Sequence, residues 1–282
     1  MTAALINGKE IAENLRERMK KEVTALHEEG KYPHLTVIII GDDPASHSYV
    51  RGKEKASKQV GIQSEIIEKE TSITEEALLQ EIERLNQAQH VHGILVQLPL
   101  PDHIDEQKVI EAINPAKDVD GFHPINVGKM MTNQDTFYPC TPFGIVHMLK
   151  EKNIPIEGQH VVIIGRSNIV GKPVGQLLLN ENATVTYCHS RTKNLKEMTN
   201  QADILIVAMG KMHAVDASYI KEGAVIIDVG VNRNEAGKLT GDVDFDAVEQ
   251  KASYITPVPR GVGPMTITML LYNTIKAARG LQ

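Results

Sequence analysis

The sequence predicts an α/β protein of two domains, each a parallel sheet covered by helices. Short β-branched apolar runs alternate with amphipathic helical patterns along the chain, and this alternation is typical of βαβ units. A stretch rich in Pro, Gly, Asn and Asp interrupts the alternation at 114–142. The length of 282 residues exceeds the commonest single-domain size, so we expect one domain on each side of this stretch.

The first half begins with a helix and continues as a βαβαβ unit. Apolar residues recur every three or four positions over 8–30, which indicates an amphipathic helix ended by Gly30. The expected strands are 35–40, 64–69 and 92–98, with helices at 44–60 and 75–88 between them. Strands this apolar favour a buried parallel sheet with right-handed crossovers. The following stretch, 114–142, marks the domain boundary and is expected to border a cleft.

The alternation restarts at 143. Strands are expected at 161–165, 184–188, 204–210, 224–230 and 254–259, with helices at 143–151, from about 171, and near 194–200. The last segment, 265–280, is helical and too apolar around its circumference to face water. We therefore expect it to pack against the first domain. The first domain is then 1–140 plus 265–282, and the second, a dinucleotide-binding domain of the Rossmann type, is 141–264.

Composition excludes several classes of protein. A hydrophobic content of 41% without a long apolar run argues against a membrane protein. The N-terminus carries no export signal, so we expect a cytoplasmic protein. The net charge of −6 gives no basic stripe for nucleic acid. Cys140 and Cys188 are far apart, which predicts neither a disulfide framework nor a metal site.

The turn after the strand at 161–165 predicts a cofactor site. Gly165 and Gly171 flank this turn, where a dinucleotide pyrophosphate meets the N–H groups of a helix. Ser167 takes the place of the second glycine of the usual motif and the turn is longer, so the pattern alone fits an ordinary glycine-rich turn equally well.

The end of the next strand favours NADP over NAD. The strand at 184–188 is followed by His189, Ser190 and Arg191, with no carboxylate to repel a 2′-phosphate. Arg166 and Ser190 together offer charge-assisted and hydroxyl hydrogen bonds to that phosphate. Arg191 fits a solvated loop charge better.

Four side chains of the first domain are candidates for the chemistry. Tyr49 and Lys53 lie four residues apart near the start of a helix that follows a strand, although such a pair is usually a half-buried ring and a solvated amine. A desolvated lysine there would have its pKa lowered from ~10.4 and exchange protons. Gln97 either orients Lys53 or satisfies loop backbone. Asp120, like Asp118, either grips an amidine-like heterocycle edge or caps a turn.

Seven segments together resemble one family. They are ASHSYVRGKEKA (45–56), ILVQLPLP (94–101), KDVDGFHP (117–124), PCTP (139–142), GRSNIVGKPVG (165–175), DVGVN (228–232) and PRGVGPMTI (259–267). Their order and spacing are similar to those of the bifunctional methylenetetrahydrofolate dehydrogenase/methenyltetrahydrofolate cyclohydrolases, the FolD family. The resemblance runs from about residue 5 to residue 279.

The resemblance implies two reactions in one site. 5,10-Methylenetetrahydrofolate passes a hydride to NADP, and the methenyl cation is hydrolysed to 10-formyltetrahydrofolate. It also implies that Lys53 is the catalytic base or proton shuttle, that Tyr49 packs near the folate ring, that Gln97 supports the lysine and that Asp120 grips the pterin edge.

The same resemblance assigns the remaining site residues. The NADP contacts are Gly165, Arg166, Ser167, Ser190 and Val231, and the residues lining the folate or nicotinamide are Gly261, Gly263, Pro264 and Thr266. It implies tetrahydrofolate substrates, polyglutamylated forms among them, and a homodimer formed through the second domain.

One position departs from the family pattern. Arg260 follows the proline where the family usually has glycine. We expect arginine to be tolerated because this position does not need a positive φ; a positive φ would strain arginine by roughly 1–2 kcal/mol. A further hypothesis is that Arg260 contacts a cofactor phosphate or the glutamate tail of the substrate.

Two other functions are compatible with the fold. One is a monofunctional NAD(P)-dependent dehydrogenase in which Lys53 only binds substrate. The other is a nucleotide-binding protein without catalysis, since fold alone never establishes activity. A binder has no need of a proton-handling lysine, so the presence of Tyr49, Lys53, Gln97 and Asp120 favours the bifunctional enzyme.

Overall fold

The computed structural model describes residues 2–280. The chain divides into two units. Unit 1 combines the N-terminal segment through Glu13 with Thr141–Thr266, and unit 2 combines Asn14–Cys140 with the segment from Ile267 onward. Each unit is built on a parallel sheet with helices, which confirms the predicted fold class.

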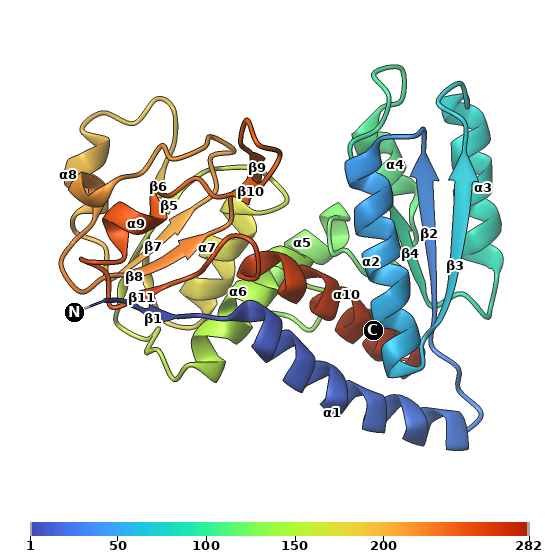
Figure 1. Cartoon of the computed structure of the whole chain (residues 1–282). Coiled ribbons are helices and arrows are strands. Elements are labelled where there is room, and N and C mark those ends of the chain that lie inside the picture. The colour runs from blue at the N-terminus through green and yellow to red at the C-terminus, as the bar shows by residue number, and fades with distance from the viewer. Residues whose placement is uncertain (1, 281–282) are drawn as a thin grey trace. The chain divides into compact units, whose positions relative to one another are not determined.

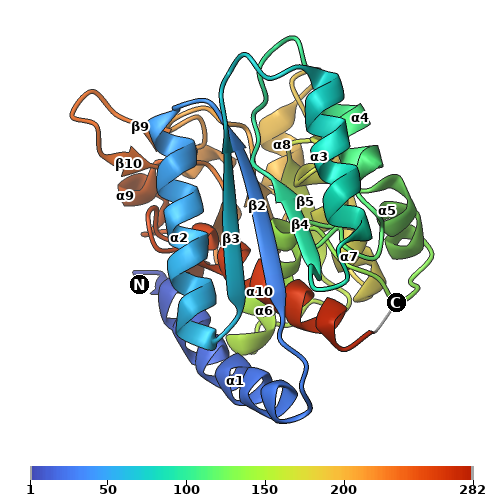
Figure 2. The same ribbon diagram turned by 90° about the vertical axis from the view of Figure 1, so that its right-hand side faces the viewer.

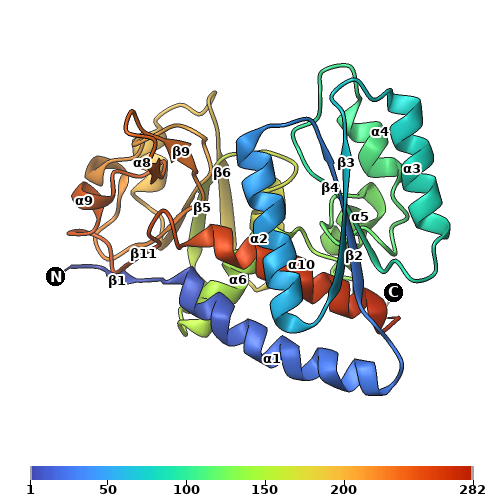
Figure 3. The same ribbon diagram turned by 45° about the vertical axis from the view of Figure 1, so that its right-hand side comes forward.

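Unit 2 contains a three-stranded parallel sheet in the order β3-β2-β4 (Figure 2). The strands are β2 (His34–Ile40), β3 (Gln63–Lys69) and β4 (Gly93–Val96). The helices are α2 (Pro44–Val60), α3 (Glu75–Gln87), α4 (Glu106–Ala112) and α5 (Pro124–Met131), together with most of α1 (Gly8–Glu28). Helices α3 and α4 cover one face of the sheet, where Leu78 and Ile82 pack against Ile38 and Ile94. Helix α2 lies over the other face (Figures 1 and 3).

The start of α2 is fixed by its own sequence. The carboxylate of Asp43 accepts a hydrogen bond from the backbone N–H of Ser46 at 2.7 Å, which satisfies one of the free donors of the first turn. Pro44 occupies the first turn, where a missing N–H costs nothing. Gly61 ends the helix with φ 89°, a left-handed conformation that suits glycine. These caps set the register that places residues 49 and 53 on one face.

The C-terminal helix α10 (Val262–Ala278) joins unit 2 from Ile267 onward. Its buried Asn273 donates hydrogen bonds through Nδ2 to the backbone oxygens of Val119, at 2.8 Å, and Tyr138, at 3.1 Å. The predicted return of this helix to the first domain is confirmed. One amide thereby ties the helix to the two segments on either side of α5.

Unit 1 contains a six-stranded parallel sheet in the order β1-β11-β8-β7-β5-β6 (Figure 1). The strands are β1 (Ala4–Leu5), β5 (His160–Ile164), β6 (Thr184–Cys188), β7 (Ile204–Val207), β8 (Val225–Asp228) and β11 (Tyr254–Ile255). Strands β9 (Asn232–Arg233) and β10 (Leu239–Thr240) form a separate antiparallel pair. The helices are α6 (Cys140–Glu151), α7 (Gly171–Asn180), α8 (Leu195–Thr199), α9 (Phe245–Val248) and the 3₁₀ turn η1 (Ala217–Tyr219). Strands β5, β7 and β8 are buried along nearly their whole length.

The N-terminal residues group with a different unit from the one that the sequence suggests. Strand β1 pairs in parallel with β11, Ala4 opposite Tyr254 and Leu5 opposite Ile255, so residues up to Glu13 group with Thr141–Thr266. The sequence expectation assigned 1–140 to the first domain, because a strand of two residues carries no periodicity. Strand β11 is also shorter than the expected 254–259, since Pro257 and Pro259 lack the N–H donors that a strand needs.

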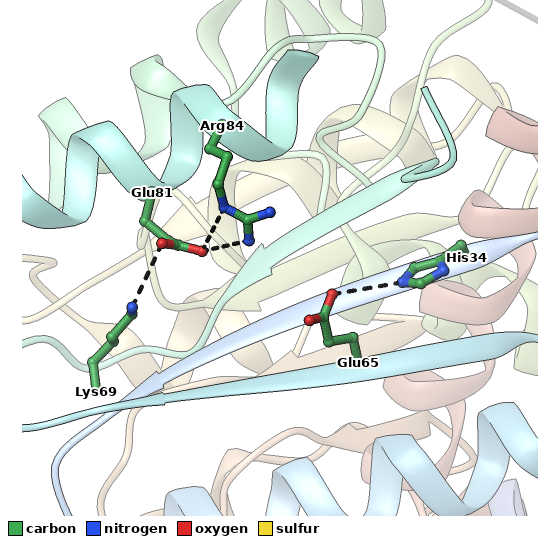
Figure 4. Close-up of polar contacts among 5 residues, drawn as sticks. All are labelled: His34, Glu65, Lys69, Glu81 and Arg84. Carbon is green, nitrogen blue, oxygen red and sulfur yellow. Dashed lines mark hydrogen bonds and ion pairs between the residues drawn. The ribbon is translucent and has the colours of Figure 1, made fainter. Parts of the chain in front are cut away.

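Ion pairs at the surface of unit 2 link β3 to α3. Glu81 pairs with Arg84 at 2.6 Å and with Lys69 at 3.5 Å (Figure 4). His34 lies 4.0 Å from Glu65 across β2 and β3, but burial lowers the pKa of His34 and so disfavours an ion pair there. Exposed pairs of this kind contribute about 0–1 kcal/mol each, so the apolar core carries most of the stability. Within residues 2–280, no helix is long and apolar enough to cross a membrane.

Candidate active site

Lys53 and Gln97 meet in unit 2 as the sequence suggested. Lys53 lies on α2 and is only 8% exposed, and its Nζ donates a hydrogen bond to Oε1 of Gln97 at 2.9 Å. Gln97 follows β4 directly, and its Nε2 donates to the backbone oxygen of Leu98 at 2.6 Å. Because the amide nitrogen is already engaged, its oxygen is directed at the lysine. Gln97 thus contacts both partners that the sequence left open, the amine of Lys53 and the loop backbone.

The surroundings of Lys53 favour loss of its proton. Burial lowers the pKa of Lys53, and the nearby acidic groups of Asp120 and Cys140 oppose this only in part. Burial in turn raises the pKa of Asp120 to about 6, although the charge of Lys53 pulls it down. A buried amine and a half-buried carboxyl with pKa values shifted toward neutrality can exchange protons near physiological pH.

Asp118 and Asp120 have different surroundings. Asp118 is 3% exposed and accepts hydrogen bonds from the backbone N–H groups of Phe122, at 3.2 Å, and His123, at 2.8 Å. It also accepts from Nδ2 of Asn126 at 2.8 Å. Asp118 therefore caps the turn. Asp120, two residues later, is the carboxylate whose charge acts on Lys53.

Gly121 fixes the loop that carries Asp120. Its φ is 76°, and a Cβ at this position would lie 2.6 Å from the backbone N of Pro139. Such an approach is possible only for glycine. The backbone before α6 therefore packs directly against the Asp120 loop.

Two further residues contact the backbone beside Asp120, although neither was predicted as a site residue from the sequence. Cys140 is buried, hydrogen bonds to the backbone oxygen of Val119 at 3.3 Å, and has a pKa well above its ordinary value because of burial. Asn273 reaches the same backbone from α10. The PCTP segment was a signal for Cys140, whereas Asn273 is far away in sequence and carries no motif.

Tyr49 lies one helical turn before Lys53 on α2. Its side chain is among the exposed large hydrophobics, at 41%. An exposed ring beside a buried lysine offers a flat surface on which a heterocycle can stack.

The glycine turn in unit 1 is as tight as the sequence predicts. Gly165 has φ 144°, and a Cβ there would lie 2.5 Å from the backbone oxygen of Ala208. A Cβ at Gly171 would lie 2.6 Å from the oxygen of Gly165. Ser167 Oγ accepts hydrogen bonds from the N–H groups of Val170 and Gly171, both at 3.2 Å. Ser167 thus holds the turn that leads into α7.

The expected phosphate ligands lie at one edge of this sheet. Strand β5 pairs with β6 up to Ile164 and Cys188, and Arg166 and Ser190 each follow two residues later, both exposed. They therefore extend beyond the carboxyl ends of neighbouring parallel strands, where ligands bind in open α/β sheets. Val231 is 49% exposed beyond the end of β8.

The loop between β11 and α10 corrects one expectation. Arg260 has φ 85°, so the expectation that this position does not need a positive φ is wrong. Its backbone oxygen accepts a hydrogen bond from the N–H of Lys9 at 3.0 Å. The next residue, Gly261, is buried, and a Cβ on it would lie 2.5 Å from the oxygen of Pro257. These close contacts impose the backbone path on Arg260.

The rest of the loop continues into α10. Gly263 and Pro264 lie in its first turn and are partly exposed. The hydroxyl of Thr266 hydrogen bonds to that of Thr141 at 2.8 Å. The loop is thereby tied to the first turn of α6.

Comparison with known families decides the relationship. Residues 6–120 match the catalytic domain of the tetrahydrofolate dehydrogenase/cyclohydrolases, and residues 139–282 match their NAD(P)-binding domain. The chain belongs to this family.

Individual members are similar over nearly the whole chain. The bifunctional protein FolD of Oceanobacillus iheyensis is 70% identical over 99% of this chain and 98% of its own length. The crystal structure of the FolD methylenetetrahydrofolate dehydrogenase/cyclohydrolase of Campylobacter jejuni is 49% identical, with a TM-score of 0.97 over 99% of this chain and 100% of its own.

A third member was crystallised with ligands. The N5,N10-methylenetetrahydrofolate dehydrogenase-cyclohydrolase of Trypanosoma brucei, complexed with NADP and an inhibitor, is 38% identical. Its TM-score is 0.95, covering 99% of this chain and 98% of its own. The predicted membership of the tetrahydrofolate dehydrogenase/cyclohydrolase family is confirmed.

Proposed function

We propose that this chain is a bifunctional folate enzyme. It oxidises 5,10-methylenetetrahydrofolate to 5,10-methenyltetrahydrofolate with NADP, and it hydrolyses the product to 10-formyltetrahydrofolate. The observation that carries the proposal is the buried amine of Lys53, which is hydrogen bonded to Gln97 and lies within the electrostatic influence of Asp120, in a chain that matches both domains of a dehydrogenase/cyclohydrolase.

The hydride step depends on placement. Removal of a hydride from the methylene bridge leaves a cation that two nitrogen atoms stabilise, so this step needs no strong base. NADP, when bound, accepts the hydride. The turn from Gly165 to Gly171 is assigned to its pyrophosphate because it follows the carboxyl end of β5 and leads into α7, the place where a dinucleotide pyrophosphate binds in such sheets. Arg166 and Ser190 fit the 2′-phosphate.

The hydrolytic step uses proton transfer at Lys53. The methenyl cation takes up one water and releases one proton in the net reaction. A neutral Nζ accepts a proton from the attacking water. The bond between the former bridge carbon and one folate nitrogen then breaks, and the ammonium returns the proton to that nitrogen. Gln97 Oε1 accepts a hydrogen bond from Nζ and so holds the amine in one position during both transfers.

Two residues of unit 2 bind the folate ring in this proposal. The carboxylate of Asp120 accepts two hydrogen bonds from the amidine-like edge of the pterin. The exposed ring of Tyr49 stacks beside the heterocycle. Gly261, Gly263, Pro264 and Thr266 line the folate or the nicotinamide, and Val231 lies beside the cofactor.

The test is a pair of assays on wild type and Lys53→Ala. Absorbance follows methylenetetrahydrofolate oxidation with NADP or NAD, and the decay of added methenyltetrahydrofolate is followed separately. We expect oxidation to prefer NADP and hydrolysis to fall by about 10²–10⁴ in the variant. Lys55→Ala is the matched control, because Lys55 is exposed on the same helix.

Each outcome separates the proposals. Oxidation without hydrolysis in wild type identifies a monofunctional dehydrogenase. Hydrolysis that survives in Lys53→Ala removes the lysine from the mechanism. The absence of both activities leaves a nucleotide-binding protein.

The enzyme is further proposed to act in the cytoplasm as a homodimer, on polyglutamylated folates among others. Strand β6 supports a dimer through unit 1, because it ends the six-stranded sheet and the nearby side chains of Leu179 and Tyr187 are 52% and 42% exposed. Sedimentation of wild type should give the mass of two chains, and Leu179→Lys should weaken this association. A monomeric wild type would refute the dimer.

A further inference from the structure

Two carboxylates of unit 1 are buried and take no part in the reactions described above. Asp228 ends strand β8 and is 4% exposed, and Asp242 lies two residues after β10 and is 0% exposed. Neither is paired with a lysine or arginine in the contacts that the structure gives for it. Two buried anions side by side are costly unless many donors surround them.

Asp228 binds the backbone of two neighbouring segments. Its Oδ1 accepts hydrogen bonds from the N–H groups of Gly230, at 2.9 Å, and Asp242, at 3.0 Å, while its Oδ2 accepts from Val243 at 2.9 Å. Burial raises the pKa of Asp228 to about 6, and the charge of Asp242 acts in the same direction. Asp228 thereby joins the loop after β8 to the segment after β10.

Asp242 binds the backbone of a third segment. Its Oδ2 accepts hydrogen bonds from the N–H groups of Met209, at 2.7 Å, and Gly210, at 2.9 Å. Its Oδ1 accepts from the N–H of Lys211 at 2.8 Å and from Nδ2 of Asn232 at 2.9 Å. Three successive N–H groups of the loop after β7 and one side chain of the loop after β8 therefore converge on one carboxylate.

These loops lie where the cofactor is expected. Strands β5, β7 and β8 are neighbours in the parallel sheet, so the loops that follow them share one edge. The loop after β7 begins at Ala208, whose oxygen is the atom closest to Gly165. The loop after β8 carries Val231 between Gly230 and Asn232, and both of these are held by the two carboxylates.

Both carboxylates are packed directly against the backbone of a glycine. A Cβ on Gly230 would lie 2.2 Å from Cγ of Asp242, and a Cβ on Gly241 would lie 1.8 Å from Oδ2 of Asp228. Glycine at both positions lets the backbone approach the carboxylates closely enough to donate to them.

We propose that Asp242 is a positioning residue for the NADP site, which fixes the loops 209–211 and 229–232 so that they present one surface to the cofactor. This inference rests on the proposed function. Asp242 acts through the backbone of these loops and touches neither substrate nor reacting atoms. An ionised carboxylate is required because all four of its partners are donors. In asparagine an N–H₂ group replaces one of the two oxygens, and it would face one or two of these donors without being able to accept from them.

The test compares the two activities in Asp242→Asn. The NADP KM of the dehydrogenase should rise by about 10-fold or more, since hydrogen bonds to charged groups are the strong ones. The cyclohydrolase, which uses no cofactor and whose proton transfer is assigned to Lys53 of unit 2, should stay within about twofold of wild type. Asp246→Asn is the matched control because Asp246 is exposed in the same region. It should change neither activity.

A second variant guards against misfolding. Asn232→Ala removes one donor and leaves the three backbone hydrogen bonds of Asp242 in place, so it should fold and raise the NADP KM by a smaller factor. An unchanged NADP KM in both variants would overturn the proposal, as would equal losses of the two activities. Calorimetric titration measures the affinity of each variant for NADP without relying on turnover. It therefore tests the role of Asp242 even if wild type shows no dehydrogenase activity, and an inactive wild type would refute only the proposed function.

Discussion

Replacing Arg260 by glycine should make unit 1 more stable. Arg260 has φ 85°, and a side chain in this left-handed region costs about 1–2 kcal/mol that glycine avoids. This gain in the free energy of unfolding is reduced by about 0.4–1 kcal/mol, because glycine makes the unfolded chain more flexible. The net gain is about 1 kcal/mol, and it equals a rise of about 3 °C in the midpoint of thermal unfolding for a unit of this size.

The matched control is Arg260→Ala. Alanine removes the guanidinium but keeps the Cβ, and therefore the strain. At an ordinary position alanine is the more stabilising of the two residues, so the order is reversed only where φ is positive. Thermal and urea unfolding of wild type and the two variants measure the difference. A glycine variant no more stable than the alanine variant would refute the strain argument.

The same variants test whether Arg260 binds a ligand. If its guanidinium contacts a cofactor phosphate or the glutamate tail of the folate, both variants should raise the KM for that ligand. Unchanged KM values for NADP and for a polyglutamylated folate would limit the role of Arg260 to the backbone.

Three further predictions concern the two units. Because burial raises the pKa of Asp120 to about 6, its carboxylate is ionised above that pH, and the folate KM should rise as pH falls through 6; a flat profile would exclude Asp120 from binding. Asp118→Asn should lower the urea unfolding free energy by about 1–3 kcal/mol, because buried donors such as that of Asn126 lose their acceptor; an unchanged midpoint would contradict this. Gly175→Ala should lower the free energy of unfolding by about 1–3 kcal/mol, since its Cβ would lie 2.2 Å from the hydroxyl of Tyr187. Adding Tyr187→Ala to this variant should recover part of the lost stability.

The parts of the fold that the sequence predicts well are those with long periodic signals. Strand β2, seven residues long and buried over six of them, follows from one apolar run. Helix α2 follows from its caps and stripe. The contact between Lys53 and Gln97 could also be anticipated, because β2 and β4 are parallel neighbours, Lys53 lies on the helix that follows β2, and Gln97 follows β4 directly.

Features set by tertiary contacts were not visible in advance. Strand β1 has two residues and gains its partner, β11, from a segment about 250 residues away in the chain. The positive φ of Arg260 follows from the packing around Gly261 rather than from its own residue type. The donors to the Asp242 carboxylate come from two segments, 209–211 and Asn232, that are separated in the chain, and no local pattern in the sequence specifies such a network.

The chain passes between the two units within α1, at the start of α6 and within α10, and this has a consequence for synthesis on the ribosome. Domains generally fold as units while the chain emerges. Unit 1, however, pairs β1 at residues 4–5 with β11 at residues 254–255, and unit 2 waits for Asn273 on α10 to reach the loop of Val119. Neither unit can complete its core until β11 and, for unit 2, α10 have left the exit tunnel. Protection of nascent chains during this interval would fall to chaperones.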